Sequence, residues 1–74
     1  MDKSDPLRDQ LGRLVRESWV RRCRSIGDTK PSHLVPYDEL SEADRETDRV
    51  IGEDILFATL EWIRDMETIL LNGK

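Results

Sequence analysis

Cysteine, histidine and aromatic residues are scarce in this sequence, and their scarcity excludes several kinds of site. The 74 residues include one cysteine, one histidine and four aromatic residues. Cys23 alone cannot form an intramolecular disulfide or a multi-cysteine zinc site, and His33 cannot complete a metal site by itself. We therefore expect no metal and no cofactor, and a reducing compartment fits best.

No apolar run in the sequence is long enough to cross a bilayer, and the polar start Met1-Asp2-Lys3-Ser4-Asp5-Pro6 has no hydrophobic signal core. These features predict a cytoplasmic protein without a membrane partner.

Motifs for catalysis are also missing. The sequence contains no nucleophile elbow, no phosphate-binding glycine loop and no HExxH pattern. Two carboxylate pairs, Asp38-Glu39 and Glu53-Asp54, are adjacent in sequence, so their side chains point in different directions on a helix. Such pairs are typical of solvated faces rather than of an acid/base dyad. We expect a protein that is not an enzyme.

Charge is plentiful and unevenly distributed. The composition is 36% hydrophobic and 38% charged, which predicts one domain over residues 1–74 with a small core that a partner subunit would help to stabilise. Residues 7–30 hold seven basic against three acidic residues, and residues 31–74 hold four against eleven. Either the two halves complement each other, or the basic face meets an anionic ligand.

The first expected helix begins at Asp5-Pro6, because aspartate caps a helix N-terminus and proline suits the first helical position. Gly27 is the expected end, since glycine adopts the left-handed conformation that closes many helices. Apolar residues recur at steps of three and four, which predicts one buried stripe. The stripe comprises Leu7, Leu11, Leu14, Val15, Trp19 and Cys23.

Between Asp28 and Glu39 the two prolines and the lack of a helical period predict an extended connection. It is too apolar for a flexible linker, so we expect Leu34, Val35 and Tyr37 to fold back against the helices. His33 in this loop is interpreted either as a packing and hydrogen-bonding residue or as a ligand contact.

A second helix is expected to begin after Ser41, which serves as the N-cap of a capping-box variant. Its apolar stripe runs through Val50, Ile51, Ile55, Trp62, Met66 and Ile69, and Asn72-Gly73 ends it. The sequence is compatible with one helix of about 30 residues or with two pieces hinged near Gly52. The predicted fold class is therefore all-α, with two main helices and an ordered Pro-containing loop.

Beyond Gly52 a second apolar face appears, consisting of Leu56, Leu60, Ile63 and Leu70. The first helix can cover only one side of the second, so we expect residues 53–72 to form a homodimer interface. The alternative is that this segment folds back as a third helix.

Three motifs together resemble the ryanodine-receptor repeat domain, over roughly residues 11–60. They are Arg16-Glu17-Ser18-Trp19, the run Lys30-Pro31-Ser32-His33-Leu34-Val35-Pro36-Tyr37-Asp38-Glu39-Leu40-Ser41-Glu42, and Asp44-Arg45-Glu46-Thr47-Asp48-Arg49. The chain is similar to the short standalone repeats of bacteria and phages, and this resemblance implies the cytoplasm of a bacterium or of a phage-infected cell. It departs from the channel form at Arg16, where the family often has histidine, and lacks the family's Gly- and Trp-containing insertion.

The resemblance implies a binding module for a nucleotide-like or other anionic ligand. The residues expected to contact that ligand are Glu17, Trp19, Arg22, Lys30, Pro36, Tyr37 and Arg45. A structural or adaptor protein that acts through the apolar face of its C-terminal helix is the alternative function. We do not expect DNA binding, because a twelve-residue loop does not match a helix-turn-helix and phosphate would repel an acidic second helix.

Overall fold

The computed structural model describes residues 5–72, and within that range the chain is helical and has no strand. Two α-helices are present, α1 (Pro6–Ser25) and α2 (Glu42–Asn72). Two short 3₁₀ turns, η1 (Pro31–His33) and η2 (Tyr37–Glu39), lie in the connection between them. The predicted all-α fold is confirmed.

Both ends of α1 are formed by the residues that the sequence predicted. At the start, the Asp5 carboxylate accepts a hydrogen bond of 2.9 Å from the backbone N–H of Leu7, and Pro6 is the first helical residue. At the end, Gly27 has a φ of 79°. This left-handed residue lets the N–H of Asp28 turn back and donate to the carbonyl of Cys23 at 2.9 Å.

The loop differs from the extended connection expected over Asp28–Glu39, because it contains the two 3₁₀ turns. Pro31 begins η1, where its missing N–H costs no hydrogen bond. Leu34 and Val35 are half-buried and Tyr37 is buried, so the prediction that the loop packs back on the helices is confirmed.

α2 is one continuous helix of 31 residues, about 46 Å long at 1.5 Å per residue. Ser41 caps it, since its hydroxyl accepts from the N–H of Asp44 at 3.2 Å. The helix passes through Gly52 without a break, so the hinged alternative and the fold-back of a third helix are both wrong. Of the expected ending at Asn72-Gly73, Gly73 lies outside the described residues.

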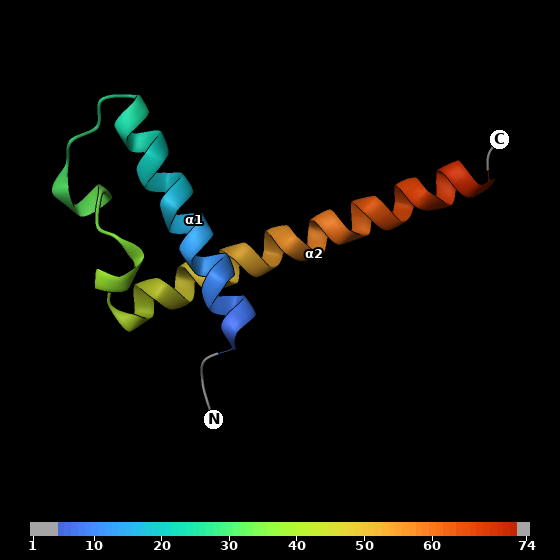
Figure 1. The fold of residues 1–74 in the computed structure, drawn as a ribbon, viewed down its shortest axis with the longest axis horizontal. Coiled ribbons are helices and arrows are strands. Elements are labelled where there is room, and N and C mark those ends of the chain that lie inside the picture. The colour runs from blue at the N-terminus through green and yellow to red at the C-terminus, as the bar shows by residue number, and fades with distance from the viewer. Residues whose placement is uncertain (1–4, 73–74) are drawn as a thin grey trace.

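The two helices cross where glycine permits a close approach (Figure 1). Gly52 of α2 is buried against Leu11 of α1. A Cβ atom added at Gly52 would lie 2.7 Å from the Leu11 Cβ and 3.0 Å from its carbonyl carbon and oxygen. The backbone of α1 therefore occupies the space that any side chain at this position would need.

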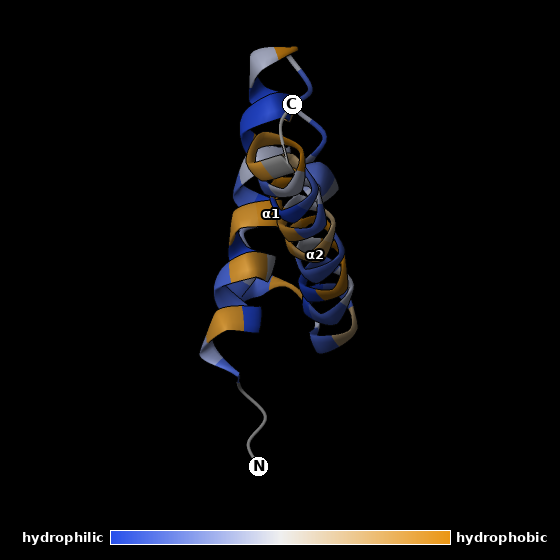
Figure 2. Ribbon diagram, turned by 90° about the vertical axis from the view of Figure 1, so that its right-hand side faces the viewer, coloured by the Kyte–Doolittle hydropathy of each residue, from blue (hydrophilic) through white to orange (hydrophobic). Residues whose placement is uncertain are grey.

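Because the helices cross rather than run side by side, the core is small. Its most buried side chains are Cys23, Tyr37 and Asp48, at 1%, 3% and 5% exposure. Apolar turns recur along both helices in Figure 2, yet many of them face solvent. The predicted buried stripe of α1 is wrong for three residues, Leu7, Leu14 and Trp19, which are about half exposed.

Ion pairs between the basic α1 and the acidic α2 surround the crossing. Arg8 donates to Glu46 at 2.8 Å and to Glu53 at 2.7 Å, and Arg16 pairs with Asp48 at 3.1 Å. Hydrogen bonds from Arg8 and Arg49 lower the pKa of Glu46 to about 2, so this carboxyl stays charged. For these residues the interpretation that the two halves complement each other is confirmed.

Beyond the crossing, α2 projects away from the rest of the molecule (Figure 1). We call residues 55–71 the arm, and α1 with the loop and the start of α2 the head. Every residue from Leu60 to Leu71 is exposed. The radius of gyration is 16.2 Å, against about 11 Å for a compact chain of this length. Within residues 5–72, neither α1 nor α2 is long and apolar enough to span a membrane.

Candidate functional site

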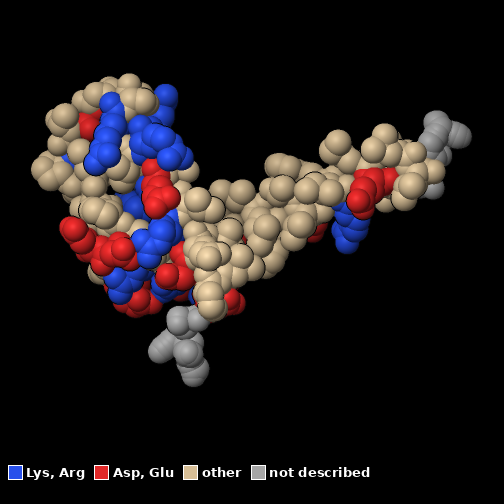
Figure 3. Space-filling model, viewed as in Figure 1, with Lys and Arg blue, Asp and Glu red and all other residues tan. Residues whose placement is uncertain are grey.

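The arm exposes a dense set of large apolar side chains. Nine residues between 49% and 85% exposed lie on it: Ile55, Phe57, Leu60, Trp62, Ile63, Met66, Ile69, Leu70 and Leu71. Figure 3 shows that uncharged residues cover most of this surface, whereas charged residues crowd the head. Soluble monomers rarely expose a contiguous apolar surface of this kind, so the arm is the first candidate interaction site.

Most of the apolar residues of the arm occupy one broad face. Ile55, Trp62 and Ile69 follow one another at seven-residue steps, and Leu56, Ile63 and Leu70 form the neighbouring row. The opposite side carries Asp54, Glu61 and Thr68 at the same spacing. This division is typical of a helix that packs against others along its whole length.

The predicted interface residues differ in their surroundings. Leu60, Ile63 and Leu70 are exposed, while Leu56 is partly covered near α1. The expectation that α1 covers the other stripe of the arm is wrong, because Trp62, Met66 and Ile69 are exposed as well. Apart from Leu56, both rows are exposed within the described chain.

An apolar groove of about 400 Å³ lies at the root of the arm, between α1 and α2. Its lining residues are Leu11, Leu14, Val15, Ser18, Gly52, Ile55, Leu56 and Thr59. Ile55 and Leu56 belong to the two apolar rows of the arm, so the groove continues the apolar face of the arm onto α1.

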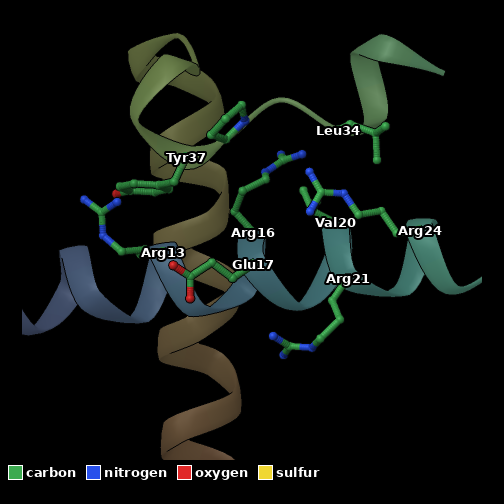
Figure 4. A pocket seen from close by; sticks show the side chains of 9 residues that line it. Arg13, Arg16, Glu17, Val20, Arg21, Arg24, Leu34 and Tyr37 are labelled. Carbon is green, nitrogen blue, oxygen red and sulfur yellow. The ribbon is translucent and has the colours of Figure 1, made fainter. Parts of the chain in front are cut away.

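A second pocket, of about 410 Å³, lies on the head between α1 and the loop (Figure 4). Four arginines and one acid line it together with apolar loop residues. The lining consists of Arg13, Arg16, Glu17, Val20, Arg21, Arg24, Leu34, Pro36 and Tyr37. Its cationic excess suits an anionic ligand.

Tyr37 is a fixed structural element of this pocket. Its hydroxyl donates to Asp9 at 2.7 Å and accepts from Arg49 at 3.0 Å, which ties the loop to both helices. Burial and the hydrogen bond to Asp9 raise the pKa of Tyr37, so the phenol stays protonated. The guanidinium of Arg13 lies 5.0 Å from the ring centroid. The ring is 3% exposed, so only a small part of it faces the pocket.

The arginines of the pocket differ in their availability. Arg13 makes a bidentate pair with Asp38 at 2.8 and 2.9 Å, and Arg16 is held by Asp48. Arg24 has no ion pair among the described residues, and Arg21 donates only to the Ser18 hydroxyl, at 3.3 Å. In Figure 4, Arg24 reaches toward the loop while Arg21 points to the opposite side of α1. Arg24 is therefore the cation best placed to meet an anion.

The structure brings together some of the predicted ligand-binding residues and separates others. Glu17, Pro36 and Tyr37 line the pocket. The remaining four, Trp19, Arg22, Lys30 and Arg45, do not line it.

Two of these four have other partners. Trp19 meets His33 edge to face, with ring centroids 5.6 Å apart. Arg45 donates to the Leu40 carbonyl at 2.8 Å and to Glu42 at 3.2 Å, so it fixes the end of the loop. The prediction grouped residues by charge and aromaticity, whereas the helical spacing of Arg13, Arg16 and Arg24 is the signal that would have found the pocket.

A third cluster brings Cys23 of α1 and His33 of η1 together, although they lie on different elements. Together with Asp28 they offer three potential metal-ligand atoms within 4.8 Å of one another. The Asp28 carboxylate is 2.7 Å from His33 Nδ1 and also accepts the backbone N–H of Lys30, at 3.0 Å. These hydrogen bonds lower the pKa of Asp28, while burial raises the pKa of the Cys23 thiol. The turn at Gly27 produces this convergence.

Comparison with family models, with curated proteins and with solved structures found no match for this chain. The resemblance to the ryanodine-receptor repeat therefore stays a prediction based on the three motifs.

Proposed function

We propose that this protein is a non-enzymatic binding module that works as a homodimer, held together by its arm. The observation that carries the proposal is the broad apolar face of the arm, whose large apolar residues from Phe57 to Leu71 are all exposed. The accessible surface of 5699 Å² exceeds the roughly 4700 Å² of a compact monomer of this mass. A chain with so small a core gains stability when such a face is buried.

A second copy is the partner that best fits this face. Stable protein interfaces bury about 800 Å² from each partner, and nine large side chains that are each about half or more exposed supply area of that order. The charges of the arm, Glu61, Arg64, Asp65 and Glu67, include both signs within two helical turns. Antiparallel pairing places Arg64 of each copy near the acidic residues of the other.

Replacing Leu60 and Ile63 together by glutamate should abolish the dimer, because four buried carboxylates in a symmetric interface would lack partners. Sedimentation or light scattering at micromolar concentration measures the effect directly. We expect a dimer mass for the wild-type protein and a monomer mass for the variant, with helix content by circular dichroism largely retained.

A matched control adds a charge on the polar side of the arm, as Thr68→Glu, and should stay dimeric. A monomer mass for the wild-type protein would contradict the proposal. An unchanged dimer in the Leu60→Glu/Ile63→Glu variant would show that another surface holds the subunits together.

As a second candidate function, we propose that the head pocket binds a nucleotide-like or other anionic small ligand. The specific observation is Arg24, a cation without an ion pair among the described residues, beside a wall formed by Leu34, Pro36 and Tyr37. Phosphate would meet the guanidinium, and the apolar wall would cover the less polar part of the ligand.

A thermal-shift panel of mono-, di- and cyclic nucleotides, with inorganic phosphate alongside, tests this candidate. At least one nucleotide should raise the melting temperature, since binding to the folded state stabilises it. Arg24→Glu should remove the shift. Arg22→Glu makes the same charge change two residues away, outside the pocket, and should keep it. A flat panel at millimolar concentration, or equal losses in both variants, would argue against this pocket.

A further inference from the structure

Cys23, Asp28 and His33 form a compact set of three different donor atoms at the junction of α1 and the loop. The Cys23 sulfur is buried on the last turns of the helix, and the other two side chains come from the loop that begins at Gly27. We propose that these three side chains bind a zinc ion. The sequence alone contains no zinc motif of recognisable spacing, and only the turn at Gly27 creates the site.

The donor set matches the preferences of zinc. Zn²⁺ is bound in proteins by thiolate sulfur, imidazole nitrogen and carboxylate oxygen, all of which are present here. Ligand atoms around a tetrahedral zinc ion lie about 3.6 Å apart, given bond lengths of 2.0–2.3 Å. The three atoms already lie within 4.8 Å of one another. A movement of the loop side chains by roughly 1 Å is enough to reach that tetrahedral geometry.

The surroundings hold two of the three ligands in place before any metal arrives. The N–H of Lys30 binds one oxygen of Asp28 at 3.0 Å, which leaves the oxygen that faces His33 as the donor. The edge-to-face contact with Trp19 orients the imidazole ring of His33. Such hydrogen bonds and contacts behind the ligands raise metal affinity by fixing their direction.

Charge balance also favours a divalent cation. As zinc binds, the Cys23 thiol releases its proton to water, the hydrogen bond between His33 Nδ1 and Asp28 breaks, and the Nδ1 proton moves through water to Nε2. The bound ion then faces one thiolate, one carboxylate and one neutral imidazole. The two negative charges neutralise the two positive charges of the ion, so no net charge is left beside the buried Cys23 sulfur.

Three protein ligands leave a fourth position for water or for a group from another molecule. The side chains of His33 and Asp28 are 38% and 25% exposed, so this position opens to solvent. Structural zinc sites have four protein ligands, whereas sites with an open position exchange ligands. The arrangement therefore points to a reversible site that fastens the loop to α1. The loop residue after His33, Leu34, lines the head pocket, so zinc would also order one wall of that pocket.

Titration of the reduced, full-length protein with Co²⁺ tests the site, because cobalt replaces zinc in tetrahedral sites and its spectrum reports thiolate coordination. We expect a thiolate-to-cobalt charge-transfer band that saturates at one ion per chain and disappears when Zn²⁺ is added.

Cys23→Ser should lose the charge-transfer band. His33→Gln, at a half-exposed position where the fold is retained, should weaken binding at least about tenfold. Asp54→Asn, an exposed carboxylate far from the cluster, is the matched control and should bind as the wild-type protein does. Absence of the thiolate band in the wild-type protein, or wild-type affinity in folded His33→Gln, would overturn the proposal.

Discussion

Gly52→Leu is expected to unfold the protein, and Gly52→Ala is expected to lower its stability by about 1–3 kcal/mol. Even the Cβ atom of alanine would lie 2.7 Å from the Leu11 Cβ and 3.0 Å from its backbone carbonyl. A backbone group cannot rotate aside, so the two helices must separate at their crossing. The whole stability of a domain of this size is roughly 5 kcal/mol, so the larger side chain removes most of it.

The direction of the change in stability on Gly52→Ala distinguishes a steric conflict at the crossing from helix propensity. In an isolated helix alanine is favoured over glycine by about 1 kcal/mol, so propensity alone predicts a more stable protein. Urea denaturation followed by circular dichroism distinguishes the two outcomes. Thr68→Ala, on the exposed arm, is the matched control and should leave stability unchanged or slightly raised. A stabilised Gly52→Ala would mean that the helices do not cross at this residue.

Arg16→Met should destabilise the protein by about 3 kcal/mol, because it leaves a buried carboxylate without its partner. Asp48 is 5% exposed, and its ion pair with Arg16 is 3.1 Å long. Methionine keeps the aliphatic length of arginine but donates no hydrogen bond. The free energy of unfolding, measured by urea denaturation at neutral pH, reports the loss.

The double variant Arg16→Met/Asp48→Leu should recover most of that loss, since both charges are then removed and an apolar pair replaces them. Arg21→Met on the same helix is the control for losing an exposed arginine, and its effect should lie within about 0.5 kcal/mol. If Arg16→Met behaves like Arg21→Met, the buried ion pair does not contribute to stability.

The local features of the fold were predictable from the sequence because they depend on nearby residues. Asp5, Pro6 and Gly27 set the ends of α1, and Ser41 sets the start of α2. The crossing angle was not predictable, because it depends on which residues of two distant segments meet. Periodicity marked Leu14 as core, but an oblique crossing at Gly52 leaves it in solvent.

The candidate sites also divide into features that depend on nearby residues and features that depend on distant ones. The apolar rows of the arm could be read from spacing along one helix, and the exposure of Leu60, Ile63 and Leu70 agrees with the prediction of an unpaired face. The exposure of Trp62, Met66 and Ile69 was not predicted, because the sequence does not show how far along α2 the first helix reaches. The cluster of Cys23, Asp28 and His33 could not be predicted from spacing. It forms because the left-handed residue Gly27 turns the loop back against the end of α1. The head pocket depends in turn on Tyr37, whose hydroxyl joins Asp9 to Arg49 across 28 and 12 residues of sequence.

The unbroken passage of α2 through Gly52 has a mechanical consequence. Head and arm share one hydrogen-bonded rod, so neither can rotate about the rod's axis without turning the other. A partner that binds the arm therefore also fixes the orientation of the head, including the direction in which Arg24 and the loop face. In a symmetric dimer joined through the arms, the length of α2 would set the distance between the two heads.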